Sequence, residues 1–419
     1  MKEYDVIIIG GGASGLVAAI SSARNGAKAA IMERLPRVGK KILVTGNGRC
    51  NFSNASLKRK NYHGTVPAFV EYVFSQFTGS QIVEFFEELG ILSKEEENGR
   101  IFPRCEQAGA VLDVLRYECK RLGVEELCSQ EVKEIRKLEN SFIIKTLNGE
   151  EFHSKKVILT TGGKASPQFG SDGSGFTLAK NLGHTIIEPY PSLVQIKLDD
   201  EYMKHCKGIR IDARVSLYAN ESLVDTQEGE VLFAEYGISG IPILQLSRYV
   251  HHPEIKNQIM RLHIDLFPEI QFHDMKKMLS ERFQKLSYKS IEDALIGLIN
   301  KKFIFPALAM ANIQRDKLCS ELNNAELDRL VHQFKDRRFL VSGTLSWRDA
   351  QVTAGGIATK EVDDKTLESK LIPGLYFAGE VLDIQGDSGG YNLAWAWASG
   401  YVAGMHAAES LVGKKRYRK

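Results

Sequence analysis

The sequence predicts an α/β protein whose parallel sheet is built from both ends of the chain, with an α+β domain inserted between them. Residues 5–33 show a buried strand, a glycine-rich turn, an alanine-rich helix and a second strand. The last part, 374–412, again shows strand, glycine-rich turn and a long helix. Between 192 and 354 the pattern changes. Because insertions enter at surface loops, we expect one discontinuous domain, 1–191 with 355–419, around an insert at 192–354.

The first strand and helix carry G-x-G-x-x-G spacing at Gly10, Gly12 and Gly15. The preceding run DVIII is apolar and β-branched, which is typical of a central strand in a parallel sheet. Gly10 is expected to turn the chain tightly, Gly12 to let the backbone approach a pyrophosphate, and Gly15 to pack the helix on the strand. The free N–H groups at the start of that helix would hold the phosphate charge.

Glu33 ends the second strand about 20 residues further on, where a carboxylate accepts hydrogen bonds from ribose hydroxyls. An acid at this position repels a 2′-phosphate, so FAD or NAD is expected rather than NADP. With the glycines, it predicts a Rossmann-like dinucleotide-binding domain.

The rest of the chain has alternating helical and strand-like patterns. Helices are predicted within 65–90 and 107–122, followed by a hairpin that turns at Asn148-Gly149 and runs into another apolar strand. Within the insert, strand-like runs precede helical ones; the strands are at 214–220, 230–240 and 259–267, and the helices at 272–286, 291–299 and 325–335. The insert is therefore predicted to be β-rich in its first half and helical in its second.

If the ligand is FAD, the loop at 39–54, GKKILVTGNGRCNFSN, must return to the site. Its glycines permit close backbone approach, and Lys40, Lys41 and Arg49 offer cations to a pyrophosphate or a flavin. A plain surface loop is the alternative. Cys50 lacks a partner cysteine nearby, so we expect it to be a packed neighbour of the flavin rather than a redox thiol.

A second segment, VILTTGGKASPQFGSDGSG at 157–175, ends a strand at Gly162-Gly163. Asp172 in its next turn can bond ribityl or substrate hydroxyls. Its S-D-G-S-G lacks the G-x-S-x-G spacing of a nucleophile elbow, which argues against a hydrolase.

The third segment is the C-terminal block, where FAGE ends a strand at Gly379-Glu380 and Asp383 follows in the turn. A helix from about Asn392 would aim its N-terminus at the electron-rich N1–C2=O edge of a reduced flavin. Small residues along this helix suit close packing. Trp395 and Trp397 point to different faces, so at least one of them is expected in the core.

Composition narrows the function classes. A net charge of +3 over 419 residues argues against a dedicated nucleic-acid or membrane-surface protein. No stretch is apolar enough to span a membrane, the acidic start MKEYD does not resemble a signal peptide, and the basic end at 414–419 is expected to be solvated. Six cysteines without a C-x-x-C pair favour free thiols in a reducing cytoplasm and no metal site. We expect a small-molecule substrate, no nucleic acid and no membrane, with no particular oligomeric state indicated.

The expected FAD contacts form one set drawn from all four segments. They are Gly10, Gly12, Ala13, Ser14, Gly15, Glu33, Arg34, Lys40, Lys41, Thr45, Gly46, Gly48, Arg49, Cys50, Asn51, Thr161, Gly162, Gly163, Asp172, Gly379, Glu380, Asp383, Asn392, Leu393 and Ala394. No second G-x-G-x-x-G follows another strand, so NAD(P)H is expected at most as a transient reductant.

These segments resemble the two-dinucleotide-binding-domain flavoproteins of the glutathione reductase type, and the ending at 353–380 is similar to the fumarate reductase branch. The chain is most similar to a bacterial family of NAD(FAD)-utilising dehydrogenases, also described as aminoacetone-oxidase-like FAD-binding proteins. The motifs that carry the likeness are GKKILVTGNGRCNFSN, GRIFP, GSDGSGF, EYGISG, VTAGGI and FAGEVLDIQGDSGGYNLAWAWASG. The resemblance implies an FAD-binding fold with a β-rich and helical insert, and chemistry on steroid-like enones or small amines.

The sequence therefore predicts an FAD-dependent oxidoreductase that moves a hydride between flavin N5 and a small organic substrate. NAD(P)H-dependent reduction of an activated C=C bond is one form of this reaction, and oxidation of a small primary amine is another. An RNA-directed flavoprotein, such as a tRNA-modifying transferase, is the alternative from another class, for which the basic-aromatic stretches at 57–63 and 414–419 would be the footprint. Arg49 and Arg100 are the candidates for polarising a substrate, and His184 and His205 for donating a proton.

Overall fold

The computed structural model describes residues 2–411, so the basic end at 414–419 lies outside the described residues. The chain divides into two compact units, one formed by Met1–Pro191 with Gln351–Lys419 and the other by Ser192–Ala350. The second unit and the expected insert differ only in their C-terminal bound, Ala350 against 354.

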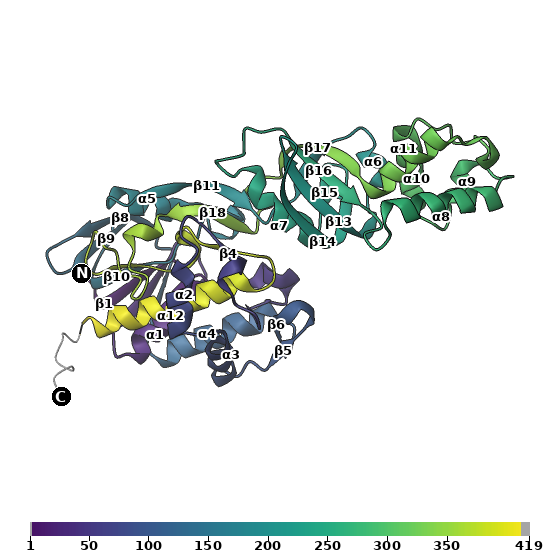
Figure 1. Cartoon of the computed structure of the whole chain (residues 1–419). Coiled ribbons are helices and arrows are strands. Elements are labelled where there is room, and N and C mark those ends of the chain that lie inside the picture. The colour runs from purple at the N-terminus through teal and green to yellow at the C-terminus, as the bar shows by residue number, and fades with distance from the viewer. Residues whose placement is uncertain (1, 412–419) are drawn as a thin grey trace. The chain divides into compact units, whose positions relative to one another are not determined.

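Strands and helices are mixed along the chain, with a run of strands from β7 to β10 and a run of helices from α8 to α11 (Figure 1). The strands are β1 Lys2–Ile9, β2 Ala29–Glu33, β3 Ser53–Asn54, β4 Tyr62–His63, β5 Ser93–Glu95, β6 Arg100–Pro103, β7 Glu125–Cys128, β8 Val132–Lys137, β9 Phe142–Thr146, β10 Glu151–Leu159, β11 Ile186–Ser192, β12 Ile196–Asp199, β13 Arg210–Ala219, β14 Ser222–Ala234, β15 Gly237–Ser239, β16 Met260–Asp265, β17 Arg337–Thr344, β18 Val352–Ile357, β19 Leu375–Phe377 and β20 Gln385–Gly386. The helices are α1 Ala13–Arg24, α2 Phe69–Gln76, α3 Gly79–Glu88, α4 Ala108–Arg121, α5 Ser174–Asn181, α6 Met203–Cys206, α7 Ile241–Val250, α8 Phe272–Lys285, α9 Ile291–Leu295, α10 Lys301–Met310, α11 Asn324–Lys335 and α12 Tyr391–Glu409.

The first unit contains the α/β fold that the sequence predicts. Its main sheet has the order β7-β2-β1-β10-β9-β8, and β19 pairs with β10. β1 runs parallel to both β2 and β10, and Val6 to Ile8 are fully buried because helices cover this part of the sheet. β9 and β10 form the predicted hairpin, with Gly149 in the left-handed region at φ +86°. The C-terminal strand β19 thus joins the sheet that β1 begins, as a discontinuous domain requires.

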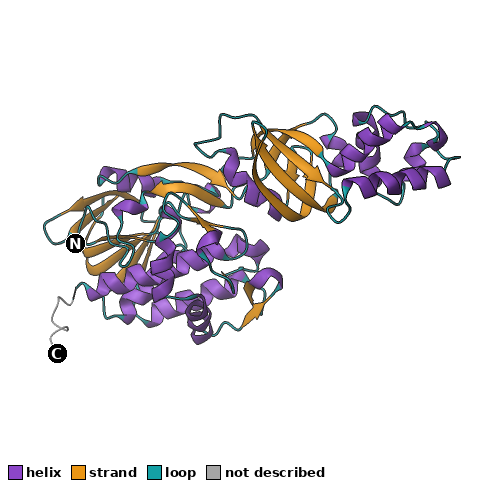
Figure 2. Ribbon diagram, in the orientation of Figure 1, coloured by secondary structure: helices purple, strands orange, loops and turns teal. Residues whose placement is uncertain are grey.

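Helices α1, α4 and α12 lie on one face of this sheet (Figure 2). Small residues let α1 and α12 pack closely, because a methyl group on Gly400 would lie 2.3 Å from the Ser14 carbonyl oxygen. Gly404 approaches the Ala18 carbonyl in the same way. Trp395 and Trp397 are both buried, and each indole donates a hydrogen bond to a backbone carbonyl, of Gly379 and Phe52 respectively. Both tryptophans therefore belong to the core.

The second unit contains a closed antiparallel barrel with the strand order β12-β15-β14-β13-β16-β17. Four of its helices, α8 to α11, come between β16 and β17 in the sequence. β13 alternates buried and exposed residues, as a strand with one face in a core must. The predicted division into a β-rich and a helical half is only partly right. The helices α6 and α7 lie among the strands, and β17, at 337–344, returns after the helices to close the barrel, with its own alternation at Arg337 to Leu340.

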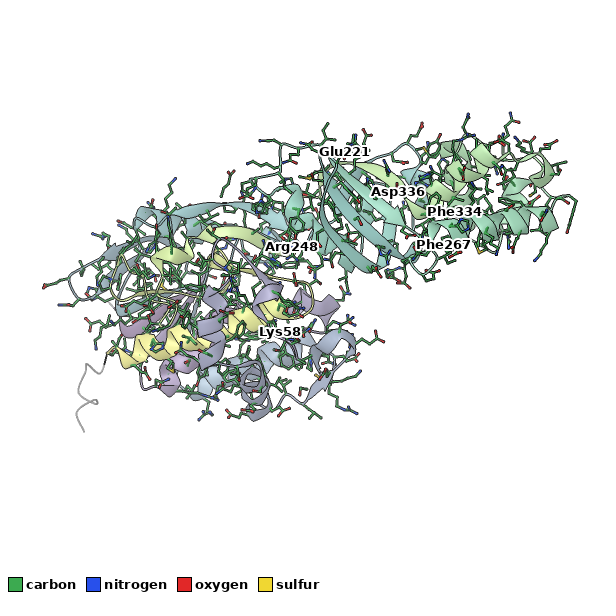
Figure 3. The ribbon with its side chains drawn as sticks, in the orientation of Figure 1. Lys58, Glu221, Arg248, Phe267, Phe334 and Asp336 are labelled. Carbon is green, nitrogen blue, oxygen red and sulfur yellow. The ribbon has the colours of Figure 1, made fainter. Side chains whose placement is uncertain are left out.

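The barrel and the helices of this unit share one hydrophobic core. Phe267 follows β16 and Phe334 lies in the last turn of α11, and their rings lie 6.0 Å apart where strand and helix meet (Figure 3). The backbone N–H of Leu266 donates to the Phe334 carbonyl beside them. Among the described residues, no helix is long and apolar enough to cross a membrane.

Candidate dinucleotide and substrate site

The glycine-rich loop between β1 and α1 has the geometry of a phosphate-binding turn. Gly10 has φ +106°, and a methyl group there would lie 2.6 Å from the Thr160 carbonyl oxygen. A methyl group on Gly15 would lie 1.9 Å from the Gly10 carbonyl oxygen, so only glycine lets the helix start this close to the strand. Gly12 differs, because a methyl group there would meet nothing within 4 Å. The space above Gly12 and the first turn of α1, which includes Ala13 and Ser14, can hold a phosphate group.

Glu33 lies beside this loop at the end of β2. Its carboxylate accepts hydrogen bonds from the backbone N–H groups of Gly11 and Leu35, both at 2.9 Å. Glu33 and Arg34 line a narrow cleft of about 50 Å³ together with Gly10, Thr161 and residues near the start of α5. The carboxylate therefore points to the place where the ribose of a dinucleotide would lie.

Asp172 pairs with Arg34 across this cleft instead of lying free for a ribityl or substrate hydroxyl. The Arg34 guanidinium and the Ser174 N–H both bind the Asp172 carboxylate and lower its pKa. The pair joins the segment after β2 to the segment before α5.

Several buried polar atoms along this cleft have no hydrogen-bond partner within the described residues. They are Arg34 Nε, Thr161 Oγ1 and Ser171 Oγ. Ser171 lies against Gly162, at φ +72°, where an added methyl group would be 2.9 Å from its hydroxyl. Unpaired buried donors are costly, so a bound group with acceptor oxygens would satisfy them. With the open space above Gly12, they fit a dinucleotide.

A second cluster lies where three loops meet. Lys41 donates to a Glu380 oxygen at 2.9 Å and to the Ala165 carbonyl at 3.2 Å, and the other Glu380 oxygen accepts from the Thr353 N–H at 2.7 Å. Gly163 lies against both Thr353 and Glu380, since a methyl group there would be 2.2 Å from Thr353 Oγ1. Gly379, at φ +79°, lies against Ser14 at the start of α1. This cluster therefore connects the two strand ends to the phosphate-binding turn.

The N-terminus of α12 forms the third part of the site. Gly390 caps the helix at φ +98° and lies against the Ser53 carbonyl, so no side chain fits there. The Asn51 amide accepts from the Gly390 N–H at 3.1 Å and donates to the Ser53 and Ile101 carbonyls. Asn392 binds the backbone of Gly386 on the preceding turn. The Ala394 N–H donates to the Gly390 carbonyl at 3.0 Å, whereas the N–H groups of Tyr391, Asn392 and Leu393 have no carbonyl one turn earlier in the helix and can face a ligand.

The loop at 42–50, which leads to Asn51, has an unusual backbone. Gly46, Asn47, Gly48 and Cys50 all have positive φ, between +55° and +84°, and Thr45 Oγ1 donates back to the Ile42 carbonyl. Burial raises the pKa of the Cys50 thiol to about 12, so it is protonated at neutral pH. Cys50 is a packed neighbour of this loop, not an activated thiol.

Asp383 lies on the turn before α12 and is almost fully buried. Its carboxylate accepts from the Thr65 N–H at 2.8 Å and the Thr65 hydroxyl at 2.6 Å, while burial raises its pKa. A methyl group on Gly64 would lie 2.2 Å from the Asp383 carbonyl oxygen. The carboxylate thus holds the segment after β4 against this turn.

The candidate catalytic side chains are placed outside these three clusters. Arg49 pairs with Glu96 at 2.6 Å and Glu106 at 3.0 Å and lies over the Phe102 ring. Arg100 donates to the Glu97 carbonyl, and Lys40 is exposed. Both arginines are thus engaged by protein groups.

The two candidate histidines also lie elsewhere. His184 is buried against Phe377 and hydrogen-bonded to Ser369, and burial lowers its pKa. His205 belongs to α6 in the second unit, where it packs on Phe305.

Four residues of the site were absent from the sequence prediction: His63, Thr65, Thr353 and Asp387. His63 and Thr65 lie at the two-residue strand β4, which pairs with β20 just before α12. Strands this short have no periodicity to detect. Thr353 lies in VTAGGI, a motif that contributed to the family resemblance but to which the sequence analysis assigned no function. The repeated glycines at 355 and 356 were the signal available there.

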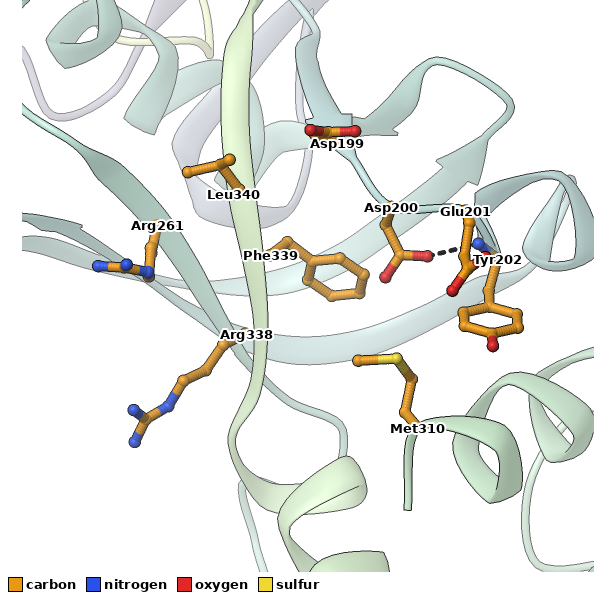
Figure 4. A pocket seen from close by; sticks show the side chains of 9 residues that line it. All are labelled: Asp199, Asp200, Glu201, Tyr202, Arg261, Met310, Arg338, Phe339 and Leu340. Carbon is orange, nitrogen blue, oxygen red and sulfur yellow. Dashed lines mark hydrogen bonds between the residues drawn. The ribbon is translucent and has the colours of Figure 1, made fainter. Parts of the chain in front are cut away.

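A larger groove, of about 460 Å³, lies in the second unit (Figure 4). It lies at β12, β17 and the end of α10, with acidic side chains from Asp199, Asp200 and Glu201 on one side and Arg261 and Arg338 on the other. The Tyr202 N–H donates to Asp200 at 2.7 Å. None of its lining residues was predicted to bind a ligand.

Comparison with known proteins agrees with this geometry. Residues 4–406 match the HI0933-like protein Rossmann domain. The chain belongs to the HI0933-like family. Within it, the chain is 40% identical over 404 residues, 96% of its length, to a 3-dehydro-bile acid delta(4,6)-reductase of Clostridium scindens, of which the match covers 98%.

It is also 30% identical to a ribosomal RNA dihydrouridine synthase of Haemophilus influenzae, over 97% of this chain and 99% of that one. Among solved structures, a mutant quinol fumarate reductase of E. coli aligns with a TM-score of 0.50 at 16% identity, over 100% of this chain and 72% of that one, which shows the shared fold.

The HI0933-like chain is therefore an FAD-dependent oxidoreductase with an α/β Rossmann-like fold and an inserted antiparallel domain. The fold is shared with a quinol fumarate reductase, which is the fold that the ending at 353–380 led us to expect. The glycine-rich turn with Glu33, the Lys41–Glu380 cluster and the N-terminus of α12 are candidate places to hold FAD among the described residues of its first unit.

Proposed function

We propose that this protein reduces a C=C bond conjugated to a carbonyl group in a small cyclic substrate of the 3-oxo-4-ene steroid type. The observation that carries the proposal is the 40% identity, over nearly the whole of both chains, to a bile acid delta(4,6)-reductase. That relative's name describes saturation of such bonds. The cofactor-facing residues of this chain fit the same chemistry.

The proposed path of FAD follows the three clusters of the first unit. Glu33 would accept hydrogen bonds from the ribose hydroxyls, the turn at Gly12 and the first turn of α1 would hold the pyrophosphate, and the first turn of α12 would face the flavin. Ser14 touches Gly400, which is ten residues beyond the Gly390 cap, so the two helix N-termini lie about 15 Å apart along α12. Glu380 follows Gly379, which lies against Ser14 at the start of α1, so the Lys41–Glu380 pair would orient the linking hydroxyls.

FAD, when bound, supplies exchange of a hydride with an organic substrate. The protein then has two tasks, to stabilise negative charge and to deliver a proton. The N-terminus of α12, with its dipole and free N–H groups, would stabilise negative charge at the pyrimidine edge of the flavin. NAD(P)H is the proposed transient electron donor, because the chain has a single G-x-G-x-x-G turn.

A second candidate is reduction of a uracil ring in ribosomal RNA. Two relatives, 30% and 29% identical over nearly the whole chain, bear the name ribosomal RNA dihydrouridine synthase. This reaction also saturates a C=C bond next to a carbonyl. Lys58, Arg59 and Lys60 are exposed and make no ion pair within residues 2–411, and their charges suit a phosphate backbone. The alternative substrate, a small primary amine, would be oxidised, so electrons would flow in the opposite direction, from the substrate to the protein.

The test is an anaerobic titration of the purified yellow protein with NADH and with NADPH, followed by addition of a substrate. We expect one nicotinamide to bleach the flavin band and a 3-oxo-4-ene steroid to restore it, with the saturated ketone as product by mass spectrometry. Restoration by unmodified ribosomal RNA, and not by the steroid, would favour the second candidate. Bleaching by a primary amine alone would contradict both reductase proposals.

A further inference from the structure

The segment before α12 contains an aspartate–histidine pair with no assigned role. His63 Nε2 lies 2.8 Å from Asp387 Oδ1, joining β4 to the turn that ends in the α12 cap. The other carboxylate oxygen accepts from the Asn61 amide at 3.1 Å, and the Asp387 N–H donates to the Asn61 carbonyl at 2.9 Å. Asn392, in the first turn of α12, donates to the Asp387 carbonyl. The aspartate is therefore fixed from three sides.

This arrangement determines which histidine nitrogen is available to a ligand. An ionised carboxylate only accepts hydrogen bonds, so His63 Nε2 is the donor to Asp387 and Nδ1 is the nitrogen left for a ligand. No group within residues 2–411 binds Nδ1, and the side chain is 31% exposed against 16% for Asp387. A base held by a fixed acid, with its other nitrogen open, is the geometry of general acid–base groups in enzymes.

We propose that His63 Nδ1 is the group that donates the substrate proton, with Asp387 as its positioning residue; the inference rests on the proposed function. Saturating a conjugated C=C bond adds a hydride to one carbon and a proton to its neighbour. The hydride is the contribution of the reduced cofactor, which a reduced nicotinamide replenishes. His63 gives the proton from Nδ1, the neighbouring carbon forms the C–H bond, and water then reprotonates the imidazole.

Other titratable groups lie near the His63–Asp387 pair, and their effects on the pH dependence of the reaction must be distinguished from the effect of His63. Asp383 is bonded to Thr65, two residues after His63, and Tyr62 and Tyr391 lie on the buried side of β4. Arg59 and Lys60 lie on the preceding turn. Because proton donation needs the imidazolium form, the reductive reaction is expected to slow as the pH rises. We therefore assign to His63 only the part of the pH dependence of the rate that disappears when His63 is replaced.

The experiment compares His63→Gln, Asp387→Asn and a control, His273→Gln, whose side chain is exposed on α8. Each holoenzyme is reduced with dithionite and mixed anaerobically with a 3-oxo-4-ene steroid in a single turnover. We expect H63Q to reoxidise about 100-fold or more slowly and to lose the alkaline fall in rate, and D387N to slow about 10-fold. The control variant and the flavin content should match the wild type.

A second readout does not depend on turnover. Binding of a phenolic steroid, whose hydroxyl can donate to His63 Nδ1, is measured by calorimetry to the oxidised protein. We expect about 10-fold weaker binding in H63Q and no change in H273Q. If the wild type turns over the steroid and H63Q is equally fast and equally pH-dependent, the assignment of His63 is overturned while the proposed function stands. If the reduced wild type is not reoxidised by the steroid, the proposed function fails and the assignment falls with it.

Discussion

At the scale of single residues, the glycines of the first turn perform separable tasks. Gly15 is needed for folding, because a side chain there would overlap the Gly10 carbonyl, whereas the space at Gly12 is open. We predict that Gly12→Val folds with a thermal midpoint near that of the wild-type apoprotein but does not retain FAD, measured by the visible flavin absorption of the purified protein. Gly109→Ala, where nothing lies within 4 Å, is the control. A yellow G12V would contradict the placement of the pyrophosphate.

Cys50 and Cys105 offer a test of burial at the same scale. Cys50 is fully buried with its pKa raised to about 12, and Cys105 is exposed. Because the thiolate is the nucleophile, native protein treated with iodoacetamide at pH 8 should be alkylated at Cys105 and spared at Cys50, as read by peptide mass spectrometry. Fast alkylation of Cys50 would mean that its loop opens in solution.

At the scale of elements, the contact of α1 with α12 joins the two ends of the chain. A methyl group on Gly404 would lie 2.3 Å from the Ala18 carbonyl oxygen, so the helices would have to separate. We predict that Gly404→Ala lowers the free energy of unfolding by about 1–3 kcal/mol in urea, even though alanine favours helices. Gly109→Ala on α4 should leave stability equal or slightly higher. Equal stability of G404A would show that the helices adjust without cost.

The contact of α1 with α4 depends on a buried carboxylate. Arg121 and Arg24 bind Glu118, which is only 6% exposed, and lower its pKa. A lowered pKa stabilises the fold at pH values above the ordinary glutamate pKa of about 4.3, and this contribution is lost as the pH falls below it. Glu118→Gln should therefore be less stable than the wild type at pH 7, and the difference should shrink toward pH 3 in urea titrations. A constant difference would contradict this linkage.

At the scale of the whole molecule, all three clusters proposed for FAD lie in the first unit, and the second unit has a core of its own. β11 and β18, which flank the insert, pair with each other, so a short linker can join them. We predict that a chain lacking residues 194–349, closed by a Gly-Ser linker, still purifies yellow. Loss of flavin from a folded, shortened chain would show that the insert contributes to binding.

The sequence by itself determined the elements whose signals are local. The apolar strand, the G-x-G-x-x-G spacing and Glu33 lie within thirty residues of one another. Together they predict a strand, a helix and a second strand that bind a dinucleotide, so β1, α1, β2 and the cofactor class could be predicted from this segment alone. Long helices such as α4, α8 and α11 were equally clear from their period. The barrel was foreseen as strands, but β17 lies far along the chain from β12, and periodicity does not reveal which strands pair.

Only the tertiary structure decided which charged groups face the site. Arg49 and Arg100 share the loop composition of a binding site, yet Glu96, Glu106 and a backbone carbonyl engage them. His63 and Asp387 are 324 residues apart, and the two-residue strands that bring them together carry no periodic signal. Short-range pattern fixes secondary structure, whereas the position of a side chain relative to a distant partner depends on packing of the complete fold.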